Sequence, residues 1–238
     1  MTNKHHSKRE VLRKRRARQR QVRQTVTISV VVLFFLGVAW IIYSALQPDG
    51  TATVDGITVG GPTPELVGTK QYSHAPPFLI DTEKQYLATV TLAKGGSFVI
   101  ELYADKAPIT VNNFVFLARD GYYDGVTFHR VIDGFMAQAG DPTGTGGGGP
   151  GYTFANEIND LEYDRAGVVG MANTGYPESN GSQFFIMFNA YGLSESEYTI
   201  FGQVIDGMEI VDGITRRNPE KNPDFPGDAI ETIVITEE

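Results

Sequence analysis

The chain of 238 residues contains no cysteine and only four histidines. The missing cysteines exclude a disulfide framework, a thiol nucleophile and any metal site that needs thiolate ligands. Beyond the N-terminal region the histidines are His74 and His129, and neither stands in an HExxH or another metal-ligand spacing. The sequence therefore predicts no metal centre and no bound cofactor, and a Ser-His-Asp hydrolase would have only these two histidines to draw on.

A glycine-rich run at 144–149 matches the spacing of a dinucleotide-binding fingerprint. That fingerprint needs a helix directly after it, because the helix N-terminus binds the phosphate. Pro150, Gly151 and Tyr152 follow instead. We therefore predict no nucleotide site in this run.

Positive charge is concentrated at the N-terminus. Residues 1–24 carry ten Lys or Arg and a single acid, Glu10, although the whole chain has a net charge of −8. A basic tail on an acidic body can bind nucleic acid. An apolar stretch follows directly, however, and a basic run in that position is typical of a membrane-topology signal. We therefore predict no nucleic-acid partner.

Residues 25–46 form an uncharged and mostly apolar stretch of 22 residues. A helix of roughly 20 apolar residues spans a bilayer, whereas the apolar core of a cleaved signal peptide has only about 7–15. Because the basic cluster precedes this stretch, the positive-inside rule places 1–24 in the cytoplasm. We therefore predict a single-pass protein of the cell membrane, anchored through 25–46, with an extracytoplasmic linker at 47–83.

The predicted linker is rich in Gly, Pro and Thr and has few large apolar residues. No helical period survives in it, and the Pro and Gly residues force several turns. Val54, Ile57 and Val59 leave room for one short hairpin. We expect the Pro-rich part to be an extended tether.

From residue 84 onward the pattern is that of a β-rich domain. Two β-rich runs at 86–92 and 97–103, separated by 94–96, predict a hairpin. A helix is predicted to begin at Pro108 and to end near Gly121. Further strands are predicted at 126–131, 135–139, 168–172, 183–188, 199–204 and 230–236, and a second helix at 208–214. Many strands with two isolated helices indicate a closed antiparallel barrel.

The most specific signal in the chain lies in two regions. Residues 128–141 read FHRVIDGFMAQAGD, while 170–173 and 180–186 read GMAN and NGSQFFI. These segments resemble the signature segments of the cyclophilin family of peptidyl-prolyl cis-trans isomerases. The resemblance implies that residues 84–238 form a cyclophilin-like isomerase domain whose fold is mainly β: a closed eight-stranded antiparallel barrel capped by two helices. With the predicted membrane helix and the missing cysteines, we expect a membrane-anchored, bacterial-like member of the family.

The activity that this resemblance implies is rotation about X-Pro peptide bonds, which needs no nucleophile, base or metal. The uncatalysed barrier is about 18–20 kcal/mol because the amide C–N bond is partly double. Rotation concentrates a lone pair on the prolyl nitrogen, so a fixed donor aimed at that atom stabilises the twisted state. Arg130 is the predicted catalytic donor, since a guanidinium is charged and presents a rigid fork of N–H groups.

The other predicted site residues bind the substrate. Phe135, Met136, Phe185 and Leu193 are predicted to grip the proline ring, Gln138, Asn173 and Gln183 to hold the flanking peptide, and the resemblance adds Ala172 and Tyr198. Each has an alternative when taken singly. Apolar residues on strands more often belong to the core, amides can satisfy backbone groups of the barrel, and Arg130 can belong to a surface ion pair.

The match to the family weakens at 189–198. The family carries an aromatic residue, often Trp, on one pocket wall there, followed by a Leu-Asp-Gly turn. Leu193 stands either for the aromatic residue or for the turn leucine, and Asp-Gly is missing. Because that wall resembles the anchor of cyclosporin, the difference argues against tight cyclosporin binding. The predicted partners are Pro-containing polypeptides that fold outside the cytoplasm. The alternative is a non-catalytic module or chaperone that binds Pro-containing segments in the same groove.

Overall fold

The computed structural model describes residues 52–54, 57–59, 66–68, 70–176, 178–193, 197–221 and 223–238. The predicted basic tail and transmembrane helix, residues 1–46, lie outside the described residues. Of the helices in the described ranges, none has the length and apolar character needed to cross a membrane.

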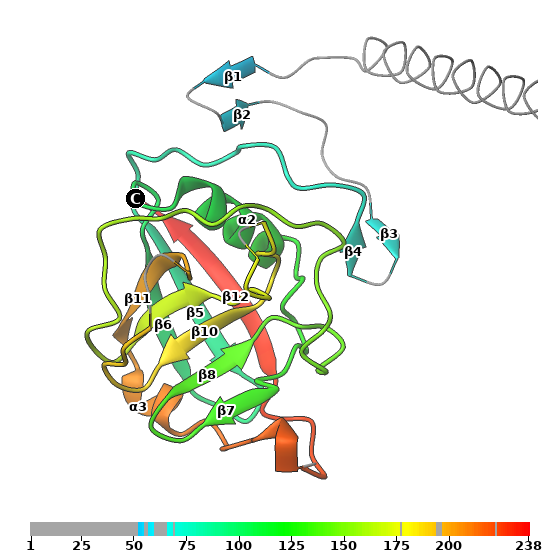
Figure 1. The fold of residues 1–238 in the computed structure, drawn as a ribbon, viewed down its shortest axis with the longest axis vertical. Coiled ribbons are helices and arrows are strands. Elements are labelled where there is room, and N and C mark those ends of the chain that lie inside the picture. Colours follow the sequence, from blue (N-terminus) through cyan, green and yellow to red (C-terminus); the bar gives the residue numbers. More distant parts are fainter. Residues whose placement is uncertain are drawn as a thin grey trace, which may run out of the picture. The chain divides into compact units, whose positions relative to one another are not determined.

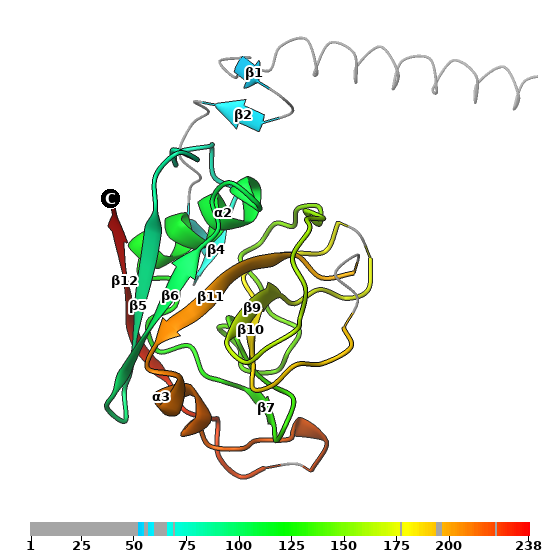
Figure 2. The ribbon, with the colours of Figure 1, turned by 90° about the vertical axis from the view of Figure 1, so that its left-hand side faces the viewer.

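Eight strands form one antiparallel sheet, in the order β12-β5-β6-β11-β9-β10-β8-β7 (Figure 1). Figure 2 shows β12, β5, β6 and β11 side by side. The strands are β5 (Tyr86–Leu92), β6 (Ser97–Leu102), β7 (Arg130–Ile132), β8 (Met136–Ala139), β9 (Val168–Met171), β10 (Phe184–Met187), β11 (Ile200–Asp206) and β12 (Ile230–Glu237). Of the predicted runs, 126–131 differs most: only its last two residues belong to β7, and Thr127 makes an isolated bridge to Ala229.

The sheet is a half-barrel, so the prediction of a closed barrel is wrong. Its two edge strands, β12 and β7, do not pair with each other in the described sheet. The free side of β7 instead meets Arg217 through a single bridge from Val131. The segment around that bridge contains Pro219, Pro223 and Pro226. Proline has no N–H to donate to a ladder, so this segment cannot continue the sheet as a strand.

Strand alternation explains the core on one side of the sheet. Along β5 the residues alternate between buried and half-buried, and Tyr86, Ala88, Val90 and Leu92 are the buried set. Such a period of two places one row of side chains in the core and the other nearer to solvent. β5 pairs with β6 through the predicted hairpin.

The longer helix, α2 (Pro108–Arg119), packs against β12. Pro108 occupies its first turn, where a missing N–H leaves no hydrogen bond unmade. The preceding Ala107 offers no side-chain cap. The carboxylate of Glu157 replaces it by accepting hydrogen bonds from the amides of Ile109 and Thr110, at 2.9 and 2.7 Å. The shorter elements are α3 (Met208–Asp212) and the 3-10 helix η1 (Pro219–Lys221).

The predicted linker contains ordered structure. The expected hairpin is present as β1 (Ala52–Val54) and β2 (Ile57–Val59), and a second pair follows as β3 (Leu66–Gly68) and β4 (Gln71–Tyr72). Residues 70–83, called the arm below, pack on the sheet domain: Tyr72 is only 4% exposed, and the amide of Leu79 donates to Oδ1 of Asn112 at 2.7 Å.

Candidate active site

A pocket of about 210 Å³ is lined by side chains from β7, β8 and β10 and from the segments after β9 and β10. Its lining residues, which define the Arg130 pocket, are Arg130, Phe135, Met136, Gln138, Ala172, Asn173, Phe185, Leu193 and Tyr198. All nine stand in the set predicted from the sequence. The remaining member, Gln183, lines an adjoining pocket and is hydrogen-bonded to Gln138.

Strand register explains why these distant residues meet. Arg130 on β7 lies opposite Gln138 on β8, and Gln138 lies opposite Phe185 on β10. Directly opposite residues of antiparallel strands share a face, so the three side chains form one row. Gly170 on β9 lies opposite Phe185, and a Cβ there would come within 2.6 Å of Cζ of that ring. Glycine therefore leaves the space that Phe185 occupies.

The guanidinium of Arg130 is half-buried and makes no ion pair with a carboxylate of the described residues. Its Nη1 donates to Oε1 of Gln138 at 3.4 Å and lies 3.7 Å from Sδ of Met136. Its Cζ lies 5.7 Å from the centre of the Phe135 ring. Because its contacts are weak and neutral, the positive charge is available to a ligand in the pocket.

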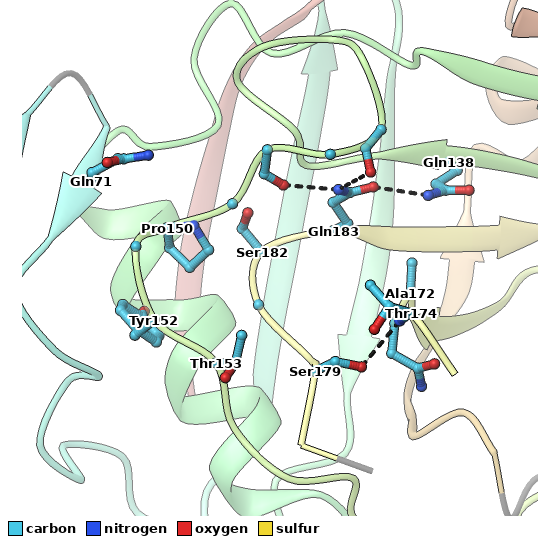
Figure 3. Close-up of a pocket in the computed structure, with 17 residues that line it drawn as sticks. Gln71, Gln138, Pro150, Tyr152, Thr153, Ala172, Thr174, Ser179, Ser182 and Gln183 are labelled. Carbon is cyan, nitrogen blue, oxygen red and sulfur yellow. Dashed lines mark hydrogen bonds between the residues drawn. The ribbon is translucent and has the colours of Figure 1, made fainter. Parts of the chain in front are cut away.

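Two amide side chains beside the pocket hold each other in place. Nε2 of Gln138 donates to Oε1 of Gln183 at 2.9 Å. Nε2 of Gln183 in turn donates to the carbonyl oxygens of Gly146 and Gly148, at 3.0 and 2.9 Å (Figure 3). The glycine-rich run at 144–149 is therefore a loop whose carbonyl groups orient the site, which the sequence did not predict.

A buried carboxylate organises that loop. Asp141 is 1% exposed, and its Oδ2 accepts hydrogen bonds from the amides of Gly146, Thr145 and Gly148 at 2.6, 3.1 and 3.1 Å. Its Oδ1 accepts from the amide and hydroxyl of Thr143 at 2.7 and 2.8 Å. Burial alone would raise the pKa of Asp141, but these hydrogen bonds outweigh it and hold the pKa below its ordinary value. The signal for this arrangement was an Asp at the head of a Thr- and Gly-rich run, a pattern typical of side chain-to-backbone turns.

The apolar part of the pocket belongs to a small hydrophobic cluster separate from the main core. Phe185 lies at its centre, stacked on Tyr163 at 5.6 Å and meeting Tyr198 edge-on at 5.9 Å between ring centres. Tyr191 contacts Phe135 at 4.4 Å between ring centres. Sequence reasoning missed Tyr163 and Tyr191, because isolated tyrosines outside the family motifs carry no distinctive pattern.

The side chains of Leu193 and Asn173 differ in what they contact. Leu193 lines the Arg130 pocket, so it occupies the wall position and not the turn. The amide of Asn173 is used within the protein: Nδ2 donates to the carbonyl of Glu197 at 2.7 Å, and Oδ1 accepts from the amide of Gly175 at 2.9 Å. Its side chain therefore fits the structural alternative, in which the amide satisfies backbone groups, here those of Glu197 and Gly175.

His129 precedes the catalytic candidate but points into the protein. It is 2% exposed, and neither ring nitrogen has a hydrogen-bond partner among the described residues. Burial lowers the pKa of His129, and the nearby charge of Asp141 only partly opposes that effect. Within the described ranges, no cluster of three or more His, Asp or Glu side chains could hold a metal ion.

Comparison with known proteins places these features in a family. The sequence profile of the cyclophilin type peptidyl-prolyl cis-trans isomerases matches residues 87–236. A peptidyl-prolyl cis-trans isomerase-like 1 of Rhizopus delemar is 55% identical over 120 residues, which are 49% of this chain and 72% of that protein. A peptidyl-prolyl cis-trans isomerase of Schizosaccharomyces pombe is 44% identical over 146 residues, 59% of this chain and 94% of that protein.

Solved structures agree with this result. The crystal structure of a cyclophilin type peptidyl-prolyl cis-trans isomerase of Cryptosporidium parvum has a TM-score of 0.57 and 36% sequence identity, and the match covers 65% of this chain and 99% of that one. The structure of the same protein in the presence of the dipeptide Ala-Pro has a TM-score of 0.56. The half-barrel is thus a cyclophilin fold.

The chain belongs to the family of cyclophilin-type peptidyl-prolyl cis-trans isomerases. It is accordingly an enzyme of that class.

The predicted localisation has to be corrected. These relatives are isomerases and isomerase-like proteins of eukaryotes, which gives no support to a bacterial-like, membrane-anchored type. The described ranges contain no membrane-spanning helix, and the residues of the predicted topology signal, 1–46, lie outside those ranges. The assignment to the cell membrane as a single-pass protein, with a cytoplasmic N-terminus, is therefore not upheld.

Proposed function

We propose that the Arg130 pocket binds the proline ring of an X-Pro segment and that Arg130 donates a hydrogen bond to the prolyl nitrogen as the bond twists. The observation that carries this proposal is the row of Arg130, Gln138 and Phe185 across three strands. This row places Arg130, a charged donor without an acidic partner, on the same face as the apolar ring of Phe185. A proline ring packed on Phe185 would bring its nitrogen towards the guanidinium of Arg130.

The donor interacts more strongly with the twisted amide than with the planar one, which is the condition for catalysis. The planar nitrogen shares its lone pair with the carbonyl, and the twisted nitrogen keeps it. One hydrogen bond with a charged partner contributes about 1.5–3 kcal/mol to stability, and a donor that is preorganised for the transition state contributes about 2.7–4 kcal/mol, or two to three powers of ten in rate. The remaining acceleration has to come from holding the ring in a dry pocket while the flanking backbone is fixed.

Gln138 and Gln183 support this arrangement by fixing each other. Donors that are already oriented need no reorganisation when the charge distribution changes, and preorganisation of this kind is a main source of catalysis. The substrates that we propose are X-Pro bonds in folding polypeptides. Uncatalysed isomerisation takes tens to hundreds of seconds, slow enough to limit folding.

The test compares the full chain with two variants in an isomerisation assay on an Ala-Pro peptide. Arg130→Ala is expected to lower kcat/KM by about 10²–10³, the usual effect of losing one transition-state donor. Arg130→Lys should fall between wild type and Arg130→Ala, because it keeps the charge but loses the planar fork. Arg119→Ala, which removes an exposed arginine of α2, is the control and should leave the rate unchanged. Normal catalysis by folded Arg130→Ala would show that the assigned donor is wrong.

A further inference from the structure

A second pocket adjoins the Arg130 pocket and reaches the arm. This glycine-loop pocket has a volume of about 620 Å³ and shares Gln138, Ala172 and Asn173 with the Arg130 pocket. Its other walls are the 146–153 loop, the 179–183 segment and Gln71 of the arm. Figure 3 shows Gln71 at one end of the view and Gln138 at the other. A peptide with its proline in the Arg130 pocket would therefore place a neighbouring side chain in the glycine-loop pocket.

The arm is fastened beside this pocket by specific contacts. The amide of Tyr72 donates to the carbonyl of Pro150 at 2.8 Å, and its hydroxyl donates to Oδ2 of Asp120 at 2.6 Å. Nζ of Lys70 donates to the carbonyl of Tyr122 at 2.6 Å. Gly151 has a φ of +94°, and a Cβ there would lie 2.7 Å from the carbonyl oxygen of Tyr72. The arm and the pocket rim are therefore fitted to each other.

Strand alternation decides which side chain of the arm faces the pocket. β4 consists of Gln71 and Tyr72, and successive side chains of a strand point to opposite sides. Tyr72 is buried in the main core, and Gln71 is exposed and lines the glycine-loop pocket. The burial of Tyr72 thus fixes the direction of Gln71.

The amide of Gln71 is available for a ligand. Four amide side chains line the glycine-loop pocket, and three of them are used within the protein: Gln138 and Gln183 bond to each other, and Asn173 bonds to neighbouring loops. The side chain of Gln71 makes no hydrogen bond to another residue in the described part of the chain. None of the residues that line this pocket carries a charge. A neutral side chain that donates and accepts hydrogen bonds suits this wall best.

We propose that Gln71 is a specificity-determining residue, which favours substrates with a neutral hydrogen-bonding side chain near the proline. The proposal rests on the proposed function, since it requires the proline in the Arg130 pocket. The family profile begins only at residue 87, so the contact is an addition that this chain makes to the family domain. The arm would be part of the enzyme and not a passive connection.

The test uses the full chain and pairs of peptides that contain Ala-Pro and carry either Gln or Leu at one further position. The variable residue stands two positions before the proline in one series and two positions after it in the other. For wild type, kcat/KM should be about three- to tenfold higher with Gln than with Leu in one series, the effect of one net hydrogen bond. Gln71→Leu should bring that ratio to about one, mainly through a lower kcat/KM for the Gln peptide.

Two further variants complete the design. Gln85→Leu makes the same chemical change at an exposed residue outside the pocket, and it should keep the wild-type ratio. Gln71→Glu should favour Lys over Gln in the responsive series by about two- to fivefold, the effect of an exposed ion pair.

The outcomes separate this inference from the proposed function. A Gln-to-Leu ratio that is unaffected by Gln71→Leu in both series overturns the role of Gln71, while Arg130-dependent catalysis of the same peptides leaves the proposed function standing. Catalysis that does not depend on Arg130 contradicts the proposed function and removes the basis of the inference. Loss of the ratio in Gln71→Leu alone, with Gln85→Leu unchanged and catalysis dependent on Arg130, supports both.

Discussion

Gln138 donates a hydrogen bond of 2.9 Å to Oε1 of Gln183, and each of the two amides is thereby held in one orientation. Gln138 has its oxygen left to accept from Arg130, at 3.4 Å. Gln183 has its nitrogen left to donate to the glycine-rich loop. A continuous series of hydrogen bonds thus runs from Arg130 to that loop, whose amides are bound by the buried carboxylate of Asp141.

Asp141→Asn is expected to lower the free energy of unfolding by about 2–4 kcal/mol, although the two side chains have nearly the same shape. Both carboxylate oxygens accept hydrogen bonds, so an amide NH₂ at either position faces a donor and leaves it unsatisfied. Urea denaturation at pH 7 measures the change. Asp160→Asn, at an exposed carboxylate, is the control and should leave the unfolding curve in place. Equal stability of Asp141→Asn and wild type would mean that the loop does not depend on the carboxylate.

Local patterns were sufficient to predict much of the fold. The strand at 86–92 was found with the expected bounds, because regular alternation and a Gly-containing turn are short-range signals. The helix from Pro108 was found for the same reason, since proline and glycine mark its two ends. The half-barrel could not be predicted from such signals. It depends on which distant edges meet, and the proline-rich segment around 219–226 prevents the last pairing.

The candidate site shows the same limit. The family motifs contain the residues of the Arg130 pocket, so the resemblance was enough to name them. Asp141 also stands in a motif, but which loop amides its carboxylate binds depends on the loop conformation, which the motif does not specify. Gln71 lies outside the family match, and only the burial of Tyr72 brings it to the pocket. The composition of the predicted linker, 47–83, indicated only a tether.

His129 should make stability depend on pH. Its folded-state pKa is lowered by burial, whereas a histidine in an unfolded chain has a pKa of about 6.5. Below that pH the unfolded state takes up a proton that the native state does not, so stability falls as pH falls, by up to about 1.4 kcal/mol per pH unit. Above about pH 6.5 the histidine is neutral in both states, so it causes no loss of stability there. Asp141, Arg217 and Arg130 are the charged groups that act on this ring.

His129→Leu is expected to remove that pH dependence between about pH 7 and the folded-state pKa. The ring makes no hydrogen bond with a described residue, so replacing it with an apolar side chain should change stability at pH 7.5 by less than about 1.5 kcal/mol. Thermal unfolding at pH 7.5, 6.5 and about 5.5 gives the comparison. His74→Leu, at an exposed histidine, should behave like wild type. If His129→Leu kept the wild-type dependence of stability on pH, that dependence would belong to another titrating group.

Tyr72 should connect the arm to the stability of the whole domain. Tyr72→Phe loses the hydrogen bond to Asp120 and is expected to lower the free energy of unfolding by about 1 kcal/mol. Tyr72→Ala also loses the ring that packs against Phe116 at 5.3 Å, which should cost about 3–5 kcal/mol.

The control for Tyr72 is Tyr176, which is 73% exposed. Tyr176→Ala is expected to leave the denaturation midpoint within experimental error. If the arm were only a tether, Tyr72→Ala would be as harmless as Tyr176→Ala, and the packing assigned to the arm would be wrong.

Leu193 is expected to limit the binding of cyclosporin, because it occupies the wall of the Arg130 pocket where the family carries an aromatic residue. Leu193→Trp would add roughly 60 Å² of apolar surface and an indole N–H donor, so the affinity for the drug should rise about tenfold. Fluorescence titration of the new tryptophan measures the affinity, and inhibition of Ala-Pro isomerisation checks it in both proteins. Leu79→Trp, at an exposed leucine of the arm, is the matched control and should show no gain. Equal affinities of wild type and Leu193→Trp would mean that this wall does not contact the drug, and the weak binding expected of the wild type would then need another cause.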